Sequence, residues 1–102
     1  MDVKYYECHV TIEPVFDARL DALHRLSAEY RFKPAKLLMQ KRAQATPERS
    51  DKDTFCTAHS KTFDDIASRM RLFVTALHEH GYQVYRNKIE AVVLDERFER
   101  VA

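Results

Sequence analysis

Two short polar segments of the sequence each carry a histidine and a threonine two residues apart. In the first, His9 precedes Thr11; in the second, Thr57 precedes His59. Residues two apart on a strand point to the same face of a sheet, so each segment can present an imidazole beside a hydroxyl. An imidazole titrates near neutral pH and can act as a general base or a general acid. If the segments pair, His9 and His59 form a candidate acid–base pair, with Thr11 and Thr57 as ligand-binding hydroxyls.

Charged residues of the first and last predicted strands could complete such a site. Arg86 and Lys88 could supply positive charge for a small anionic ligand, whereas Glu7 and Glu90 could orient an imidazole or change its pKa. The alternative is a polar sheet face that is covered by solvent or by a partner, because threonine favours strands in any case. The residue types therefore predict either a catalytic site or a binding face.

The segment His9-Val10-Thr11-Ile12 resembles the His-x-Thr-x element of the two-histidine phosphoesterase superfamily. That superfamily carries two such elements in a longer chain, and here the second segment has the reverse order, Thr57-Ala58-His59. The resemblance implies phosphoester chemistry on a small anionic substrate.

A second resemblance extends over most of the chain, through the runs KYYECHVTIEPVF, LLMQKR, TPERSDKDTFCT and NKIEAVVLDER. These runs resemble a family of small uncharacterised bacterial single-domain proteins. The resemblance implies a standalone bacterial domain and brings with it no activity, cofactor or catalytic residue.

The elements that must position these residues follow from the hydrophobic pattern. Alternating or β-rich runs predict strands over residues 3–13, 35–41, 53–59 and 82–94. Helical spacing of apolar residues predicts one helix from Asp17, as its N-cap, to about residue 31. A second helix is expected from Thr62, with Asp65 in a capping box, to Gly81, the only glycine, as its terminator.

The expected fold is an α+β, ferredoxin-like β-α-β-β-α-β sandwich formed by residues 1–102 as one domain. Its four-stranded antiparallel sheet would carry both helices on one face, with the first and third strands as central neighbours. The helices should cover the face that carries Cys8, Val10, Ile12, Cys56 and Ala58. The opposite face would be open, although the strand register is undetermined, and a bulge near residues 85–87 would change the positions of the last strand. Residues 42–52 are expected to form a polar loop.

Composition narrows the function classes. The net charge is +1, with 17 basic against 16 acidic residues, which argues against a nucleic-acid binder. No Cys-x-x-Cys or His-Glu-x-x-His motif is present, so neither a metal nor a cofactor is expected. No apolar run is long enough to span a membrane, and the start of the chain lacks a signal region, so a cytoplasmic location is expected.

Domains with one bare sheet face commonly pair through it, and small proteins favour two-fold assemblies. The sequence therefore favours a homodimerising module that binds a ligand or partner through the open sheet face. A small phosphoesterase with His9 and His59 as its acid–base pair is the alternative.

Overall fold

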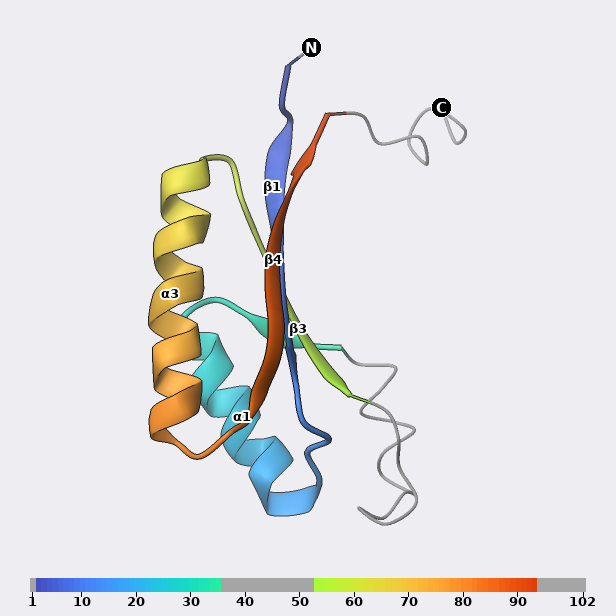
Figure 1. Cartoon of the computed structure of the whole chain (residues 1–102), viewed down its shortest axis with the longest axis vertical. Coiled ribbons are helices and arrows are strands. Elements are labelled where there is room, and N and C mark those ends of the chain that lie inside the picture. Colours follow the sequence, from blue (N-terminus) through green and yellow to red (C-terminus); the bar gives the residue numbers. More distant parts are fainter. Residues whose placement is uncertain (1, 36–52, 94–102) are drawn as a thin grey trace.

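Strands and helices alternate in the order β-α-β-β-α-β in the computed structural model, which describes residues 2–35 and 53–93. The elements are β1 (Tyr5–Ile12), α1 (Asp17–Glu29), β2 (Lys33–Pro34), β3 (Thr54–Ser60), α3 (Phe63–Glu79) and β4 (Val84–Val92). The strands form one antiparallel sheet in the order β2-β3-β1-β4, so the first and third strands are the central neighbours, as predicted. Both helices lie on the same side of the sheet (Figure 1).

The hydrophobic core lies between the sheet and the helices. The alternate residues predicted to face the helices are all buried, namely Cys8, Val10, Ile12, Cys56 and Ala58. Against them pack Leu23 of α1 and Ile66, Phe73 and Leu77 of α3. Phe73 stacks on Phe32, with ring centroids 4.4 Å apart. Burying each such side chain contributes about 2 kcal/mol. Within residues 2–35 and 53–93, no helix lies on the opposite face of the sheet (Figure 1).

The second predicted strand begins earlier than expected. The structure places β2 at Lys33–Pro34, paired with Thr57 and Cys56 of β3, whereas the sequence pattern predicts this strand over residues 35–41. Proline lacks a backbone N–H and is tolerated in an edge strand. Residues 36–41 of the predicted strand, and the predicted loop 42–52, lie outside the described residues.

The two helices begin in different ways. The Oγ1 of Thr62 accepts a hydrogen bond from the backbone N–H of Asp65 at 3.2 Å, which confirms the predicted N-cap of α3. The prediction that Asp17 caps α1 is wrong, because Phe16 is the N-cap and Asp17 is the first helical residue. The backbone carbonyl of Phe16 accepts from the amides of Arg19 and Leu20, so the turn closes without a capping side chain.

Both helices end in the same hydrogen-bonded turn. After α3, Gly81 has a φ of 82° and Tyr82 donates its amide to the carbonyl of Leu77, so the predicted glycine terminator is confirmed. After α1, Arg31 occupies the equivalent position with a φ of 59°, and the amide of Phe32 donates to Ser27. A residue with a Cβ in this left-handed conformation costs about 1 kcal/mol.

Both cysteines are buried and free, as the sequence predicts. Burial raises the pKa of the Cys8 thiol to about 11, against a smaller opposing effect of Arg69, and raises the pKa of Cys56 to about 12. At pH 8 the native protein should therefore react with a thiol reagent at least about 100-fold more slowly than free cysteine. Labelling followed by mass spectrometry checks this, with guanidinium-unfolded protein as the control. Rapid labelling of both thiols in the native state would contradict it.

Neither described helix has the length and apolar character that a membrane span requires.

Candidate functional site

The register of β1 against β3 determines which polar side chains meet on the open face. His9 lies opposite Thr57, and Glu7 lies opposite His59. The two histidines therefore lie on neighbouring strands, in successive rows of the same face. This brings together four of the residues that the sequence nominated, although the histidines are not directly opposite each other.

A carboxylate joins the two imidazoles. The Nε2 of His9 lies 2.8 Å from Oε1 of Glu7, and the Nε2 of His59 lies 3.4 Å from Oε2 of the same side chain. The other ring nitrogen of His9, Nδ1, lies 3.3 Å from the Oγ1 of Thr57. Both nitrogens of His9 are thus engaged, and Glu7 has one oxygen toward each histidine.

β4 places its charged residues beside this cluster. Lys88 lies opposite His9, and Glu90 lies opposite Glu7. The Nζ of Lys88 is 3.0 Å from Oε1 of Glu90, which is also 3.7 Å from Nε2 of His9. A hydrogen bond from Lys88 and its positive charge lower the pKa of Glu90. In this arrangement Lys88 pairs with a carboxylate of its own chain.

Arg86 joins the open face at its other end, opposite Thr11. The pairing shifts between Thr11 and Ile12, whose β4 partners are Arg86 and Val84, so that Tyr85 is an extra residue in β4. The last strand, whose register the sequence does not determine, therefore contains a bulge at Tyr85. As a result, Arg86 lies on the same face of the sheet as Lys88. Among the described residues Arg86 forms no ion pair.

Thr11 lies in the predicted row, but it is only 6% exposed. Its neighbours across the strands are Phe55 and Arg86. Phe55 is 37% exposed, so the aromatic ring rather than the threonine hydroxyl is the accessible group at this end. Thr11 therefore offers a ligand little surface.

The chemistry open to this cluster is limited by Glu7. An anion bound between His9 and His59 would face a carboxylate, which repels it unless the imidazoles are protonated. No group of three or more His, Cys, Asp or Glu side chains within residues 2–35 and 53–93 is arranged to hold a metal ion. The array is suited to hydrogen bonding across a contact surface.

Three basic residues that sequence reasoning missed lie beside His59. Arg31, Lys33 and Arg69 line a cavity of about 360 Å³ together with Thr57, Ala58 and His59. On the other side of His59, a second cavity of about 440 Å³ is lined by Lys4, Tyr5, His59, Ser60 and Lys61. The sequence does contain an indication for Arg31. This arginine stands just after the first helix, at the position that Gly81 occupies after the second helix, although glycine is the residue that favours a positive φ there.

Arg69 has a structural role in this region. It is buried, with 8% exposure, and its guanidinium donates to the backbone carbonyls of Tyr30, Arg31 and His59 at 3.1, 2.8 and 2.8 Å. It also donates to Oδ2 of Asp65 at 3.2 Å. Arg69 thus connects the end of α1, the end of β3 and the first turns of α3.

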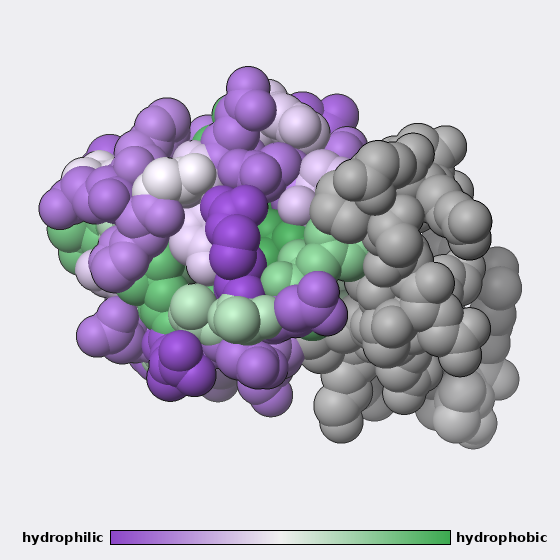
Figure 2. Space-filling view, turned by 90° about the horizontal axis from the view of Figure 1, so that it is seen from below, coloured by the Kyte–Doolittle hydropathy of each residue, from purple (hydrophilic) through white to green (hydrophobic). Residues whose placement is uncertain are grey.

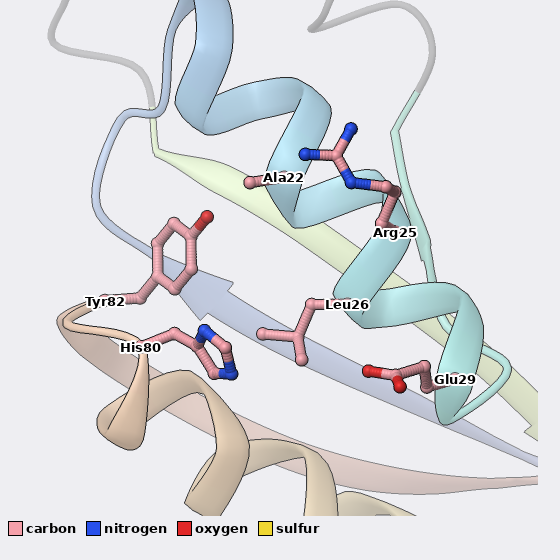
Figure 3. Close-up of a pocket in the computed structure, with 6 residues that line it drawn as sticks. All are labelled: Ala22, Arg25, Leu26, Glu29, His80 and Tyr82. Carbon is pink, nitrogen blue, oxygen red and sulfur yellow. The ribbon is translucent and has the colours of Figure 1, made fainter.

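A further cavity of about 370 Å³ lies between α1 and the segment after α3 (Figure 3). Its lining residues are Ala22, Arg25, Leu26, Glu29, His80 and Tyr82. The hydroxyl of Tyr82 donates to the carbonyl of Arg19 at 3.0 Å. Seen from below, the described surface is mainly hydrophilic, with smaller hydrophobic areas between the hydrophilic residues (Figure 2). None of the predicted site residues lines this cavity.

Comparison of the chain with protein-family models, with curated proteins and with solved structures gives no match. The two resemblances noted in the sequence therefore stay expectations, and the geometry of the open face must carry the argument for function.

Proposed function

We propose that this chain is a self-associating module, and that its open sheet face binds a second copy of the same face in a homodimer. We also infer that the domain is ferredoxin-like. The strand order β2-β3-β1-β4 and the placement of both helices on one side (Figure 1) support the fold assignment.

The observation that carries the proposal is the distribution of charge along β4. Arg86 and Glu90 are four residues apart on the same face, which separates them by about 13 Å along the strand. Lys88 and His9 form the row between them. A two-fold axis above that row, running across the strands, stacks each Arg86 over the Glu90 of the second copy. One symmetry operation thus forms two ion pairs, as an isologous interface requires. It also brings the two Lys88 side chains together near the axis, where each keeps its pair with Glu90 of its own chain.

The apolar residues of the face are compatible with the same packing. Phe55 and Val92 lie toward opposite ends of the sheet, and Phe55 is 37% exposed. The axis would bring Phe55 over His59 of the second copy, so that a ring packs on an imidazole. Apolar contacts among hydrogen-bonding residues are typical of interfaces between proteins.

The geometry gives less support to acid–base catalysis. A phosphoesterase would need His9 and His59 to reach one phosphoryl group with free ring nitrogens. Here Glu7 lies between them and binds both, and Thr57 holds the second nitrogen of His9. The same contacts favour a fixed polar surface, because they orient the side chains before a partner arrives.

Reversal of one charge tests the proposal. In Arg86→Glu, a glutamate would face the Glu90 of the second copy at two symmetric positions, and the dissociation constant should rise about 100-fold. Sedimentation equilibrium measures this: wild-type protein should reach twice the chain mass of 12.0 kDa, and the variant should remain at the single-chain mass.

The matched control is Arg71→Glu, which changes the net charge equally at an exposed position of α3, on the helical side of the sheet. It should associate like the wild type. A wild-type protein that stays at 12.0 kDa up to millimolar concentration, or an Arg86→Glu variant that associates normally, would refute the proposal.

A further inference from the structure

We propose that the end of β3 binds a phosphomonoester that carries a planar apolar group, with His59 between the two halves of the site. This inference goes beyond self-association, since it requires only one copy of the chain. In the proposed dimer Phe55 of the second copy would lie over His59, so the ligand and the second copy would compete for this residue. It rests on two cavities that share His59 and differ in character.

The first half of the site is basic. Arg31 and Lys33 line it, and Arg69 lies behind them. Among the described residues, the carboxylate that pairs with these groups is that of Asp65, whose oxygens lie 3.4 Å from Arg31 and 3.2 Å from Arg69. Three positive charges against the carboxylates of Asp65 and of Glu7, which contacts His59 at 3.4 Å, leave a net positive charge. This charge favours the phosphate group of a phosphomonoester, which carries about −1.5 to −2 at neutral pH.

The basic side chains of this first half of the site also have hydrogen-bond donors available for an anion. Arg31 has a side chain that is 68% exposed and a single ion pair, with Asp65, among the described residues. Lys33 forms no ion pair within the described part of the chain. Guanidinium groups bind phosphate oxygens through two parallel hydrogen bonds, and Thr57 lines the same cavity.

The backbone of Arg31 supplies a separate argument. Its φ of 59° is a conformation that glycine adopts without strain, and Gly81 fills the equivalent position after α3. The turn itself therefore gives no reason for an arginine, and an exposed ion pair with Asp65 contributes little. The function of this side chain is best explained by the cavity that it lines.

The second half of the site is mainly apolar. Its walls include Tyr5 and His59, whose rings meet edge to face with centroids 5.6 Å apart. Lys4 and Lys61 line the same cavity and add positive charge near it. Aromatic faces bind planar rings well, so a ring could rest against Tyr5 while its phosphate reaches Arg31 past His59.

An NMR titration with phenyl phosphate, inorganic phosphate and phenol tests both halves. Phenyl phosphate should saturably shift the amide signals of Tyr5, Thr57 and His59. Inorganic phosphate should shift those of Thr57 and His59 only, with at least about tenfold weaker binding, and phenol alone should bind more weakly still. Absence of saturable shifts at His59 with phenyl phosphate would overturn the inference.

Two variants test the basic half and the apolar half of the site separately. Arg31→Gly should weaken phenyl phosphate at least about tenfold, with a melting temperature equal to or above that of the wild type. Tyr5→Leu should weaken phenyl phosphate while leaving inorganic phosphate unchanged. Arg25→Gln is the control, because it removes a positive charge from the separate cavity of Figure 3 and should bind like the wild type. Unchanged binding in Arg31→Gly, or equal weakening in Arg25→Gln, would refute the site.

The same titration in Arg86→Glu separates this inference from the proposed self-association. That variant should remain a single chain and still bind phenyl phosphate. Loss of binding there would show that the site needs the second copy and would overturn the inference as stated.

Discussion

Replacing Arg69 by methionine is expected to lower the free energy of unfolding by about 3 kcal/mol. The guanidinium donates to three backbone carbonyls and one carboxylate. Methionine retains most of the side-chain volume but provides no donor, so these partly buried acceptors would lose their partners. The left-handed turn at Arg31 would also lose the bond that holds its carbonyl.

Urea denaturation measures the difference. Arg71→Met is the matched control, because Arg71 lies two residues away on the exposed side of the same helix, and it should change stability by less than about 0.5 kcal/mol. Arg69→Lys should also be clearly destabilising, since one ammonium cannot reach the carbonyls of Tyr30, Arg31 and His59 in the geometry of a guanidinium. If Arg69→Met unfolds at the same urea concentration as the wild type, Arg69 does not hold these elements together.

Arg69 also illustrates what the sequence could have revealed. It lies three residues after Ile66 and four before Phe73, both on the buried stripe of α3. An arginine in an apolar helical stripe must find acceptors inside the protein, so its spacing marks a structural contact. Its backbone partners were not predictable, because these carbonyls come from two distant segments, Tyr30 and Arg31 after α1 and His59 in β3.

The element order and the core face could be predicted because burial imposes a period of two on strands and 3.6 on helices. Cys8 and Cys56 fell on the helical side for that reason, and Gly81 ended α3 because the turn needs a positive φ. Asp17 failed as an N-cap because a backbone carbonyl closed the first turn of α1 instead. Local side-chain rules do not reveal that choice.

The candidate site could be predicted only in part. Alternation assigns His9 and His59 to one face, but moving one strand by two residues preserves that face, so the pattern does not determine which residues are opposite each other. The actual register puts Glu7 across from His59 and Thr57 across from His9. This places a carboxylate between the two imidazoles, and it adds support to binding, which the sequence already favoured, over catalysis.

A second charge reversal gives the largest effect on assembly. In Glu90→Arg, the new arginine would face Arg86 of the second copy, and the pair between Lys88 and Glu90 would be lost. Like charges placed in contact cost several kcal/mol, so this variant should also weaken association about 100-fold or more. Glu79→Arg, at an exposed position at the end of α3, is the control with the same change in net charge and should associate normally.

The two variants have complementary defects. Arg86→Glu carries only negative charge at positions 86 and 90, whereas Glu90→Arg carries only positive charge there. In a mixed dimer under the proposed two-fold arrangement, both contacts between positions 86 and 90 would join opposite charges. A general effect of net charge would not restore this specific pairing. In a mixture of Glu79→Arg with Arg86→Glu, the glutamate introduced at position 86 would still face the unchanged Glu90 of the other copy.

Sedimentation of the mixed variants is therefore the most direct test of the open face as a self-association surface. Arg86→Glu and Glu90→Arg should each remain single chains, and an equimolar mixture should form a one-to-one dimer at a concentration where neither associates alone. A mixture that remains at the single-chain mass, while wild-type protein dimerises, would contradict the proposed pairing of Arg86 with Glu90.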